Sequence, residues 1–197
     1  MVGAVVNIAQ WFKEFRLHLM ESPEGRSLLE ALTDSANERM VCALAASHLR
    51  KFGRTEALFW VRTEWGKYDI SWGRAKDHFQ NWEQAHTAGI AGYAGVIEAK
   101  VIYGFWPPEK KQVVIAEMIR QLRARRKNDG NDPTLEYFGL VTYVGPRDPK
   151  DAWNDPTIDW VDPDRPIVRL DESDVGALWP LERPEAWELY VGLYRQK

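Results

Sequence analysis

Cysteine is almost absent from this sequence, since Cys42 is the single one among 197 residues. One thiol cannot close a disulfide within the chain, which excludes a disulfide-stabilised secreted domain. Long apolar runs are missing too, because no window approaches the ~18 uncharged apolar residues of a transmembrane helix. Residues 1–9 lack the basic leader and the small-residue cleavage site of a signal peptide. We therefore expect a cytoplasmic protein with no membrane contact.

Familiar catalytic motifs are also missing. There is no Gly-x-Ser-x-Gly elbow, no Gly-x-x-x-x-Gly-Lys phosphate loop and no Gly-x-Gly-x-x-Gly dinucleotide fingerprint. Glu83 and His86 have the spacing of one di-iron ligand pair, but a di-iron centre needs a second pair and two further carboxylates. The Asn128–Asp132 run lacks the bidentate glutamate of a calcium loop. We predict no catalytic residue, no cofactor and no metal site, and we favour a non-enzymatic chain.

Tryptophan and charge are what stand out instead. The chain has ten Trp residues, and its net charge of -3 is unevenly spread. Residues 1–127 hold 19 Lys+Arg against 14 Asp+Glu, whereas residues 128–197 hold 7 against 15. A basic front and an acidic tail can orient a partner protein or a second copy of the chain.

Hydrophobic periodicity predicts an α+β fold in a single domain over residues 1–197. The front, residues 1–53, reads as helical, with an amphipathic helix from Val5 to Leu19 and two further helices opening at Ser22 and Ser35. Alternation then predicts a β-hairpin over residues 59–72, with a turn near Gly66.

The middle and the end of the domain mix the two kinds of pattern. Within residues 54–144 we predict the hairpin, a mixed sheet and a packed helix. Residues 74–88 and 108–127 are predicted as helices and residues 135–144 as a strand. For residues 89–105 the pattern leaves helix and strand both open. Residues 145–166 predict an extended acidic arm rich in proline and aspartate. Segment 145–197 continues with a short strand at 167–170 and ends in a C-terminal helix from Pro184. We expect this helix to dock on the domain through the residues on one of its sides, which are Trp187, Tyr190, Val191 and Tyr194.

Two sets of residues are candidate binding sites. Large aromatic side chains of the hairpin and the following segment are candidate partner anchors: Trp60, Trp65, Trp72 and Trp82. The basic end of the 108–127 helix can stabilise the helix dipole or hold phosphates: Arg120, Arg123, Arg125 and Arg126. Cys42 is expected to be a buried, unreactive thiol, and His48 a core histidine.

One stretch has a local likeness to a known family. The stretch covers about a sixth of the chain and begins with a strand from Phe138. Two turns follow, Asp148-Pro149 and Asn154-Asp155-Pro156, and then a Val-x-Leu strand that ends at Leu170. This stretch resembles the end of the β-barrel in small catalase-related haem peroxidases. The resemblance implies a haem-dependent oxidoreductase, but the family's Arg-x-x-x-Tyr helix has no counterpart, so no haem ligand is carried over.

The function that we favour from the sequence is a non-catalytic binding or assembly protein, such as an accessory subunit, adaptor or inhibitor. Its partner would be another protein or a second copy of the chain. A haem-dependent oxidoreductase is the first alternative. Nucleic-acid binding through the basic end of helix 108–127 is the second.

Overall fold

The computed structural model describes most of the helical front and the sheet. The described ranges are residues 7–34, 38–54, 59–65, 68–74, 93–131, 133–145, 160–161, 168–170 and 187–196. The helices are α1 (Ile8–Glu21), α2 (Pro23–Asp34), α3 (Glu38–Arg54) and α5 (Pro108–Asn128). The strands are β1 (Phe59–Trp65), β2 (Tyr68–Arg74), β3 (Tyr93–Tyr103), β4 (Glu136–Gly145), β5 (Trp160–Val161), β6 (Val168–Leu170) and β7 (Trp187–Gln196). The α+β fold class is confirmed.

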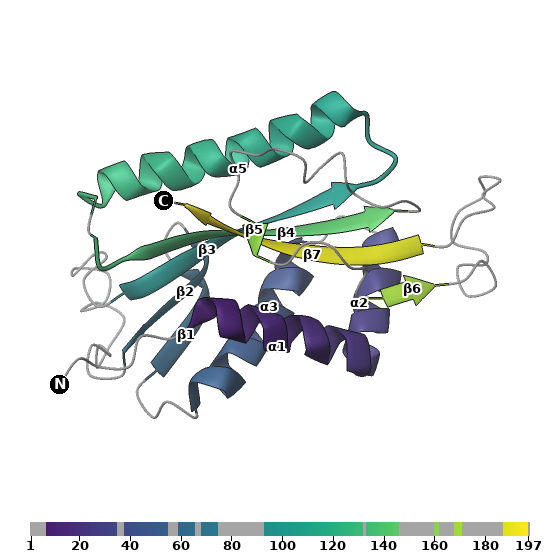
Figure 1. The fold of residues 1–197 in the computed structure, drawn as a ribbon, viewed down its shortest axis with the longest axis horizontal. Helices are drawn as coiled ribbons and strands as arrows, with labels where there is room; N and C mark the ends of the chain where they lie inside the picture. The colour runs from purple at the N-terminus through teal and green to yellow at the C-terminus, as the bar shows by residue number, and fades with distance from the viewer. Residues whose placement is uncertain are drawn as a thin grey trace.

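The strands form one mixed sheet in the order β1-β2-β3-β4-β7-β5, and β6 also pairs with β7. β1, β2 and β3 form an antiparallel meander, whereas β3 and β4 are parallel. A parallel pair needs a long crossover, and α5 supplies it. β7 then pairs antiparallel with β4. Figure 1 shows α5 on one face of this sheet and α1, α2 and α3 on the other.

Each face of the sheet has its own apolar core. On the α5 face, Met118 and Leu122 of the helix pack with Val96, Ile102 and Val141 of the strands. The larger core lies under the N-terminal helices, and its members include Trp11, Phe12, Phe15, Leu49, Ile97, Leu140 and Val191. The central strands are therefore buried on both sides, which makes any charge on them conspicuous.

Local sequence signals explain where the helices begin and end. Asn7 caps α1, because its side-chain oxygen accepts the Gln10 N–H at 3.0 Å. Pro108 occupies the first turn of α5, where its missing N–H costs nothing. Gly130 and Asn131 adopt positive φ just beyond the end of α5, a conformation that these two residue types tolerate best.

Most sequence predictions of elements are confirmed, including the hairpin, the helix from Pro108 and the short strand at 168–170. The C-terminal helix is wrong, because residues 187–196 form β7. Both faces of β7 are apolar: one core contains Leu189, Val191 and Leu193, and the other contains Tyr190 and Tyr194. The sequence of β7 therefore lacks the alternation of apolar and polar residues that indicates a strand. The open segment 89–105 resolves as β3 over Tyr93–Tyr103.

Two predicted segments lie outside the described residues. They are the helix at 74–88, of which only the start belongs to β2, and nearly all of the acidic arm at 145–166. Among the helices of the described ranges, none has the length and the apolar character that crossing a bilayer requires.

Candidate functional site

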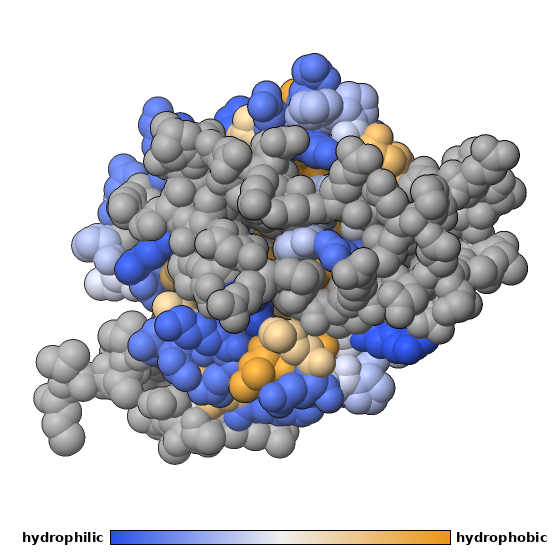
Figure 2. Space-filling model, turned by 45° about the vertical axis from the view of Figure 1, so that its right-hand side comes forward, coloured by the Kyte–Doolittle hydropathy of each residue, from blue (hydrophilic) through white to orange (hydrophobic). Residues whose placement is uncertain are grey.

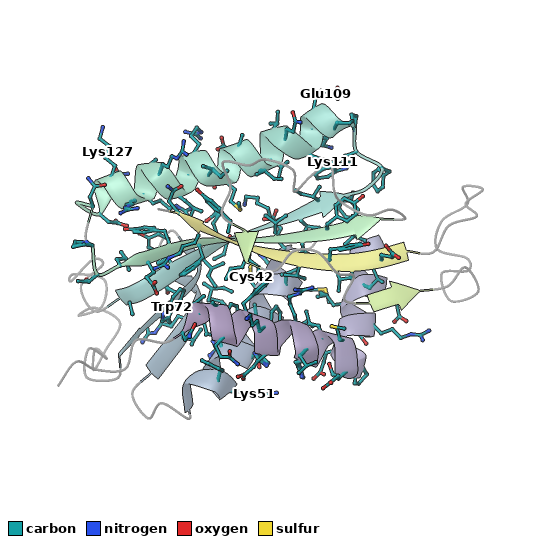
Figure 3. The ribbon with its side chains drawn as sticks, in the orientation of Figure 1. Cys42, Lys51, Trp72, Glu109, Lys111 and Lys127 are labelled. Carbon is teal, nitrogen blue, oxygen red and sulfur yellow. The ribbon has the colours of Figure 1, made fainter. Side chains whose placement is uncertain are left out.

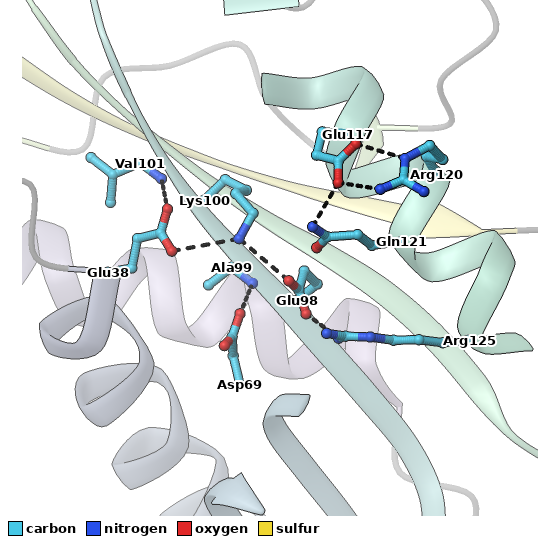
Figure 4. Close-up of polar contacts among 10 residues, drawn as sticks. All are labelled: Glu38, Asp69, Glu98, Ala99, Lys100, Val101, Glu117, Arg120, Gln121 and Arg125. Atoms are coloured by element: carbon cyan, nitrogen blue, oxygen red, sulfur yellow. Dashed lines mark hydrogen bonds and ion pairs between the residues drawn. The ribbon is translucent and has the colours of Figure 1, made fainter. Parts of the chain in front are cut away.

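The site begins where β2 and β3 separate. The two strands pair from Tyr93 to Ile97 of β3, where Ile97 stands opposite Ile70. β2 ends its pairing there, but β3 continues to Tyr103. Carboxylates take over the next two backbone donors of β3: Asp69 Oδ2 accepts the Ala99 N–H at 2.8 Å, and Glu38 Oε1 accepts the Val101 N–H at 3.4 Å (Figure 4). This edge of β3 is thus lined by acids rather than by a strand.

Two carboxylates meet across this opening. The register of β2 and β3 ends at Ile70 and Ile97, and Asp69 and Glu98 are the next residues of the two strands. Like charges close to each other are destabilising. Glu98 is only 4% exposed, and burial, followed by the Asp69 carboxylate, raises the pKa of Glu98 above its usual value. The fold therefore holds these two acids together at an energetic cost.

Two cations adjoin the acids. Lys100 Nζ lies 3.3 Å from Glu98 Oε1 and 3.5 Å from Glu38 Oε2, and Arg125 of α5 donates from Nη1 to Glu98 Oε2 (Figure 4). Burial alone would lower the pKa of Lys100, but the three carboxylates around it raise that pKa. We call Glu38, Asp69, Glu98, Lys100 and Arg125 the β3 charge cluster. Three acids against two bases leave one net negative charge when all are ionised.

The β3 charge cluster is buried at its centre and open at its rim. The side chain of Glu98 is 5% exposed, that of Lys100 17% and that of Arg125 21%. The Glu38 side chain, at the start of α3, is 42% exposed. Solvent and small ions can therefore reach the cluster from the Glu38 side.

The end of α5 is fixed against the sheet next to this cluster. Asp129 Oδ2 accepts the Tyr68 hydroxyl at 2.5 Å and the Tyr137 hydroxyl at 2.9 Å. The Arg125 guanidinium lies over the Tyr68 ring, 5.2 Å from its centroid. Burial and the bond to Asp129 raise the pKa of Tyr68, so its hydroxyl keeps its proton. These contacts set the place from which Arg125 reaches Glu98.

The donor set determines which chemistry is possible. Carboxylate oxygens are the ligands of hard cations such as Mg²⁺, which is commonly held by one or two carboxylates plus substrate phosphates. As placed, no three His, Cys, Asp or Glu side chains of the described ranges converge on one point. Glu98 is turned to its two cations and Asp69 to the Ala99 N–H. The pair Asp69 and Glu98 has the composition of a two-carboxylate Mg²⁺ site.

The basic residues predicted on α5 do not act together. Arg120 is exposed and paired with Glu117, with nitrogen–oxygen distances of 2.7 and 2.5 Å. Arg123 is exposed and Arg126 is half-buried. Arg125 faces the sheet instead, among the buried side chains of the helix. The structure thus separates Arg125, which belongs to the β3 charge cluster, from the outer arginines.

The predicted tryptophan anchors are placed as follows. Trp72 is 1% exposed and packs against Phe138 at 6.1 Å between ring centroids, in the core under the N-terminal helices (Figure 3). Its indole is a core side chain, so the expectation of a surface anchor at Trp72 is corrected. Trp60 and Trp65 belong to β1, but their side chains, like all of Trp82, lie outside the described residues.

Of the two single residues noted in the sequence, Cys42 is a core group, whereas His48 lies at the edge of the core. Cys42 on α3 is 5% exposed, and burial, followed by the Asp69 charge, raises the pKa of its thiol to about 12. The prediction of a buried thiol is confirmed. His48 is half-buried, 5.5 Å from Phe15 and 5.2 Å from His18 between ring centroids.

Sequence reasoning missed four residues of the cluster: Glu38, Asp69, Glu98 and Lys100. The signal for two of them was present, because Glu98 and Lys100 interrupt an otherwise apolar strand and alternation puts both on one face. Burying two charged side chains on one face of a central strand costs desolvation free energy, so such residues are candidates for a function. Glu38 lies in the predicted helix that opens at Ser35, and Asp69 lies in the predicted hairpin, where no sequence pattern distinguishes them.

Comparison of the chain with protein-family models, curated proteins and solved structures finds no match.

Proposed function

We propose that the chain is a hydrolase that uses a divalent cation to cleave phosphodiester bonds in nucleic acid. The observation that carries this proposal is the proximity of Asp69 and Glu98 beside Lys100, at the edge of β3 where its pairing with β2 ends. A protein that only needed a stable sheet would place apolar side chains there, since buried ion pairs are commonly less stable than apolar replacements.

The metal would be Mg²⁺ or Mn²⁺, held by the Asp69 and Glu98 carboxylates. A dication between them would replace their mutual repulsion by attraction, which relieves the cost that raises the pKa of Glu98. The bound cation would lower the pKa of a coordinated water and polarise a phosphate oxygen. Glu38, on the solvent side of the cluster, would orient that water.

Lys100 would act on the charge that develops during hydrolysis. The water oxygen forms a new bond to phosphorus, the bond to the leaving sugar oxygen breaks, and the water proton passes to solvent while the leaving oxygen is protonated. An ammonium group held by Glu38 and Glu98 can stabilise the phosphate oxygens in the transition state without having to reorganise. The raised pKa of Lys100 keeps this group charged at neutral pH.

Nucleic acid is the substrate class that the surroundings favour. Arg120 and Arg123 project from the solvent side of α5, and Arg125 on the same turns reaches the cluster. Cations along one helix can follow a phosphate backbone, and such contacts make binding salt-dependent. The outer arginines and Arg125 lie on different faces of α5, so the basic helix end and the cluster are two separate arguments for a nucleic-acid substrate.

A cleavage assay tests the proposal. Supercoiled plasmid, single-stranded DNA and RNA are each incubated with the full chain in Mg²⁺, in Mn²⁺ and with excess EDTA. We expect cleavage that EDTA abolishes, and a loss on the order of 10²-fold or more in D69N and in E98Q, as for other removed transition-state contacts.

The matched control for this assay is E30Q, which removes an exposed carboxylate of α2 that pairs with Arg26. It should cleave like the wild type. Far-UV circular dichroism of all variants separates lost chemistry from lost fold. Full cleavage by D69N, or no cleavage of any of the three nucleic acids by the wild type, would contradict the proposal.

The binding or assembly function remains a second proposal, because part of the surface favours it. Leu17 and Met20, one turn apart on α1, are 50% and 51% exposed. In Figure 2 hydrophobic colour on the visible face is confined to small areas among hydrophilic side chains. If copies associate through this turn of α1, light scattering after gel filtration will show a dimer that L17E dissociates. A monomeric wild type would remove this version of the function.

A further inference from the structure

We propose that the turn between β3 and α5 binds single-stranded nucleic acid by stacking a base on Phe105, with Lys110 and Lys111 at the phosphates beside it. We call Phe105, Trp106, Lys110 and Lys111 the α5 entry patch. The inference deepens the proposed function by naming the single-stranded form, and it rests on that function for the choice of nucleic acid. It needs no metal and no residue of the β3 charge cluster.

The first step of the argument is that this turn presents an aromatic ring to solvent. Phe105 is 45% exposed, whereas Tyr103, 5.2 Å away between ring centroids, is only 5% exposed. Trp106 lies 5.4 Å from the Tyr103 centroid and packs partly against both cores. Phe105 is therefore the exposed member of a group of three rings whose other two members are anchored in the fold.

The second step is that the turn is held in place before anything binds. The Tyr103 hydroxyl donates to the Leu32 carbonyl at 2.7 Å, which ties the end of β3 to α2. The Gly104 N–H donates to the Val144 carbonyl at 2.8 Å, and the Trp106 N–H donates to the Tyr103 carbonyl at 3.0 Å. A platform that is already ordered loses little conformational entropy when a ligand stacks on it.

The third step is that two cations lie against the aromatic side chains of this region. Lys110 Nζ lies 3.9 Å from the centroid of the Trp106 ring, and Lys111 Nζ lies 5.6 Å from that of Tyr143. The Lys110 side chain is exposed and is held next to the residue that follows Phe105. Exposed rings combined with cations are the means by which proteins bind the bases and phosphates of a single strand.

The charge of α5 continues the patch along the helix. Between Pro108 and Asn128 the helix has seven Lys and Arg residues against two Glu. In Figure 3 the labelled Lys111 lies near the start of α5 and Lys127 near its end. At a rise of about 1.5 Å per residue, these two positions are about 24 Å apart. A row of cations of this length fits the phosphate backbone of a nucleic acid.

The exposed ring is what selects the single-stranded form. Within a duplex the bases present their edges in the grooves, whereas unpaired bases can offer a flat face to an aromatic side chain. Phe105 therefore adds affinity only for a strand with unpaired bases. The lysines and arginines of α5 attract either form.

Binding without cleavage tests the inference. Fluorescence anisotropy in EDTA compares a labelled oligothymidylate of about 20 nucleotides, which does not pair with itself, with a duplex of the same length. F105A should bind the single strand at least about fivefold more weakly than the wild type and the duplex within about twofold. L17A removes an exposed apolar side chain of α1 and should match the wild type on both.

Further variants of the α5 entry patch separate stacking from other contacts. F105Y keeps the face of the ring and should bind the single strand within about twofold of the wild type. F105L keeps an apolar side chain without a ring and should lose as much affinity as F105A. K110Q should reduce the slope of log Kd against log salt concentration by about 0.7, the value of one phosphate contact on a single strand.

Several outcomes would overturn the inference. They are a wild type that does not bind the single strand, wild-type affinity in F105A or F105L, and an equal loss on the duplex. Displacement of the oligonucleotide by poly-glutamate as readily as by unlabelled oligothymidylate would also overturn it, because the patch would then select acidic polymers in general.

The same experiment keeps this inference apart from the function beneath it. Cleavage by the wild type with unchanged binding by F105A would overturn the stacking role alone. Binding that depends on Phe105, in a chain that cleaves none of the three nucleic acids, would overturn the proposed hydrolase and support the single-strand surface.

Discussion

At the scale of the residue, two glycines show how closely the core controls what β3 can carry. A Cβ added at Gly95 would lie 2.1 Å from Cζ2 of Trp72, whose rigid indole crosses β3 at this point. A Cβ added at Gly139 would meet Met118 at 2.5 Å, but there it touches the end of a flexible thioether. The same added methyl group therefore has different consequences at the two positions.

We predict that G95A lowers the free energy of unfolding by about 1–3 kcal/mol or more, because a buried indole must leave its place. G139A should cost less than about 1 kcal/mol, since Met118 can adopt another rotamer. Urea unfolding followed by tryptophan fluorescence measures both. Equal losses in the two variants would show that the Trp72 ring yields as easily as the methionine.

Glu98 of the β3 charge cluster is a buried carboxylate that destabilises the strand in which it lies. Glu98, with 4% of its surface exposed, lies in a strand whose neighbours Ile97 and Ala99 are fully buried. Keeping a carboxylate there costs desolvation that Lys100 and Arg125 offset only in part, because the pKa of Glu98 remains raised. Stability alone does not account for such a residue, and we therefore propose that Glu98 has a function.

At the scale of the element, α1 and α3 pack around His48, whose charge depends on pH. His48 of α3 contacts Phe15 and His18 of α1. Burial, followed by repulsion from His18, lowers the pKa of His48 below its usual 6.5, with Lys51 adding to the shift and Glu14 opposing it. The folded protein thus favours neutral His48.

The sign of the resulting pH dependence follows from linkage. Well above pH 6.5 His48 is neutral in both states and its contribution to stability is fully present. As the pH falls below 6.5, the unfolded chain takes up a proton that the folded chain refuses, so the free energy of unfolding decreases. H48Q should show a smaller decrease between pH 7.5 and the lowered pKa than the wild type does. Parallel curves for the two proteins, measured by urea unfolding, would contradict the prediction.

Elements were predictable from the sequence where one period dominated. Alternation from Tyr68 to Trp72 predicted β2, and Pro108 with the apolar series through Leu122 predicted α5. β7 was misread because apolar side chains on both faces fit a helix as well as a strand. The cluster was out of reach for another reason: Asp69 and Glu98 become neighbours only through the register of β2 on β3, which no local pattern specifies.

At the scale of the whole molecule, the two covered faces of the sheet explain where a site can form. α5 covers one face and α1, α2 and α3 cover the other, so a polar group on β3 has no solvent except at an edge (Figure 1). The separation of β2 from β3 creates such an edge inside the sheet. Acids from α3 and β2 meet β3 there, and α5 adds the arginine.

A cation that joins β2 to β3 at this edge would stabilise the entire fold, and this gives the last prediction. Ligand bound only by the folded state raises stability by RT ln(1 + [L]/Kd), or about 1.4 kcal/mol at a tenfold excess over Kd. For a chain of this size that is roughly 3–6 °C in Tm. Mg²⁺ at this excess should raise the Tm of the wild type and of E30Q by this amount, relative to KCl of equal ionic strength. D69N should show no specific rise, because one carboxylate of the pair is gone. Equal rises in the wild type and D69N would mean that Mg²⁺ acts elsewhere on the surface, and the separation of β2 from β3 would then be a feature of the fold alone.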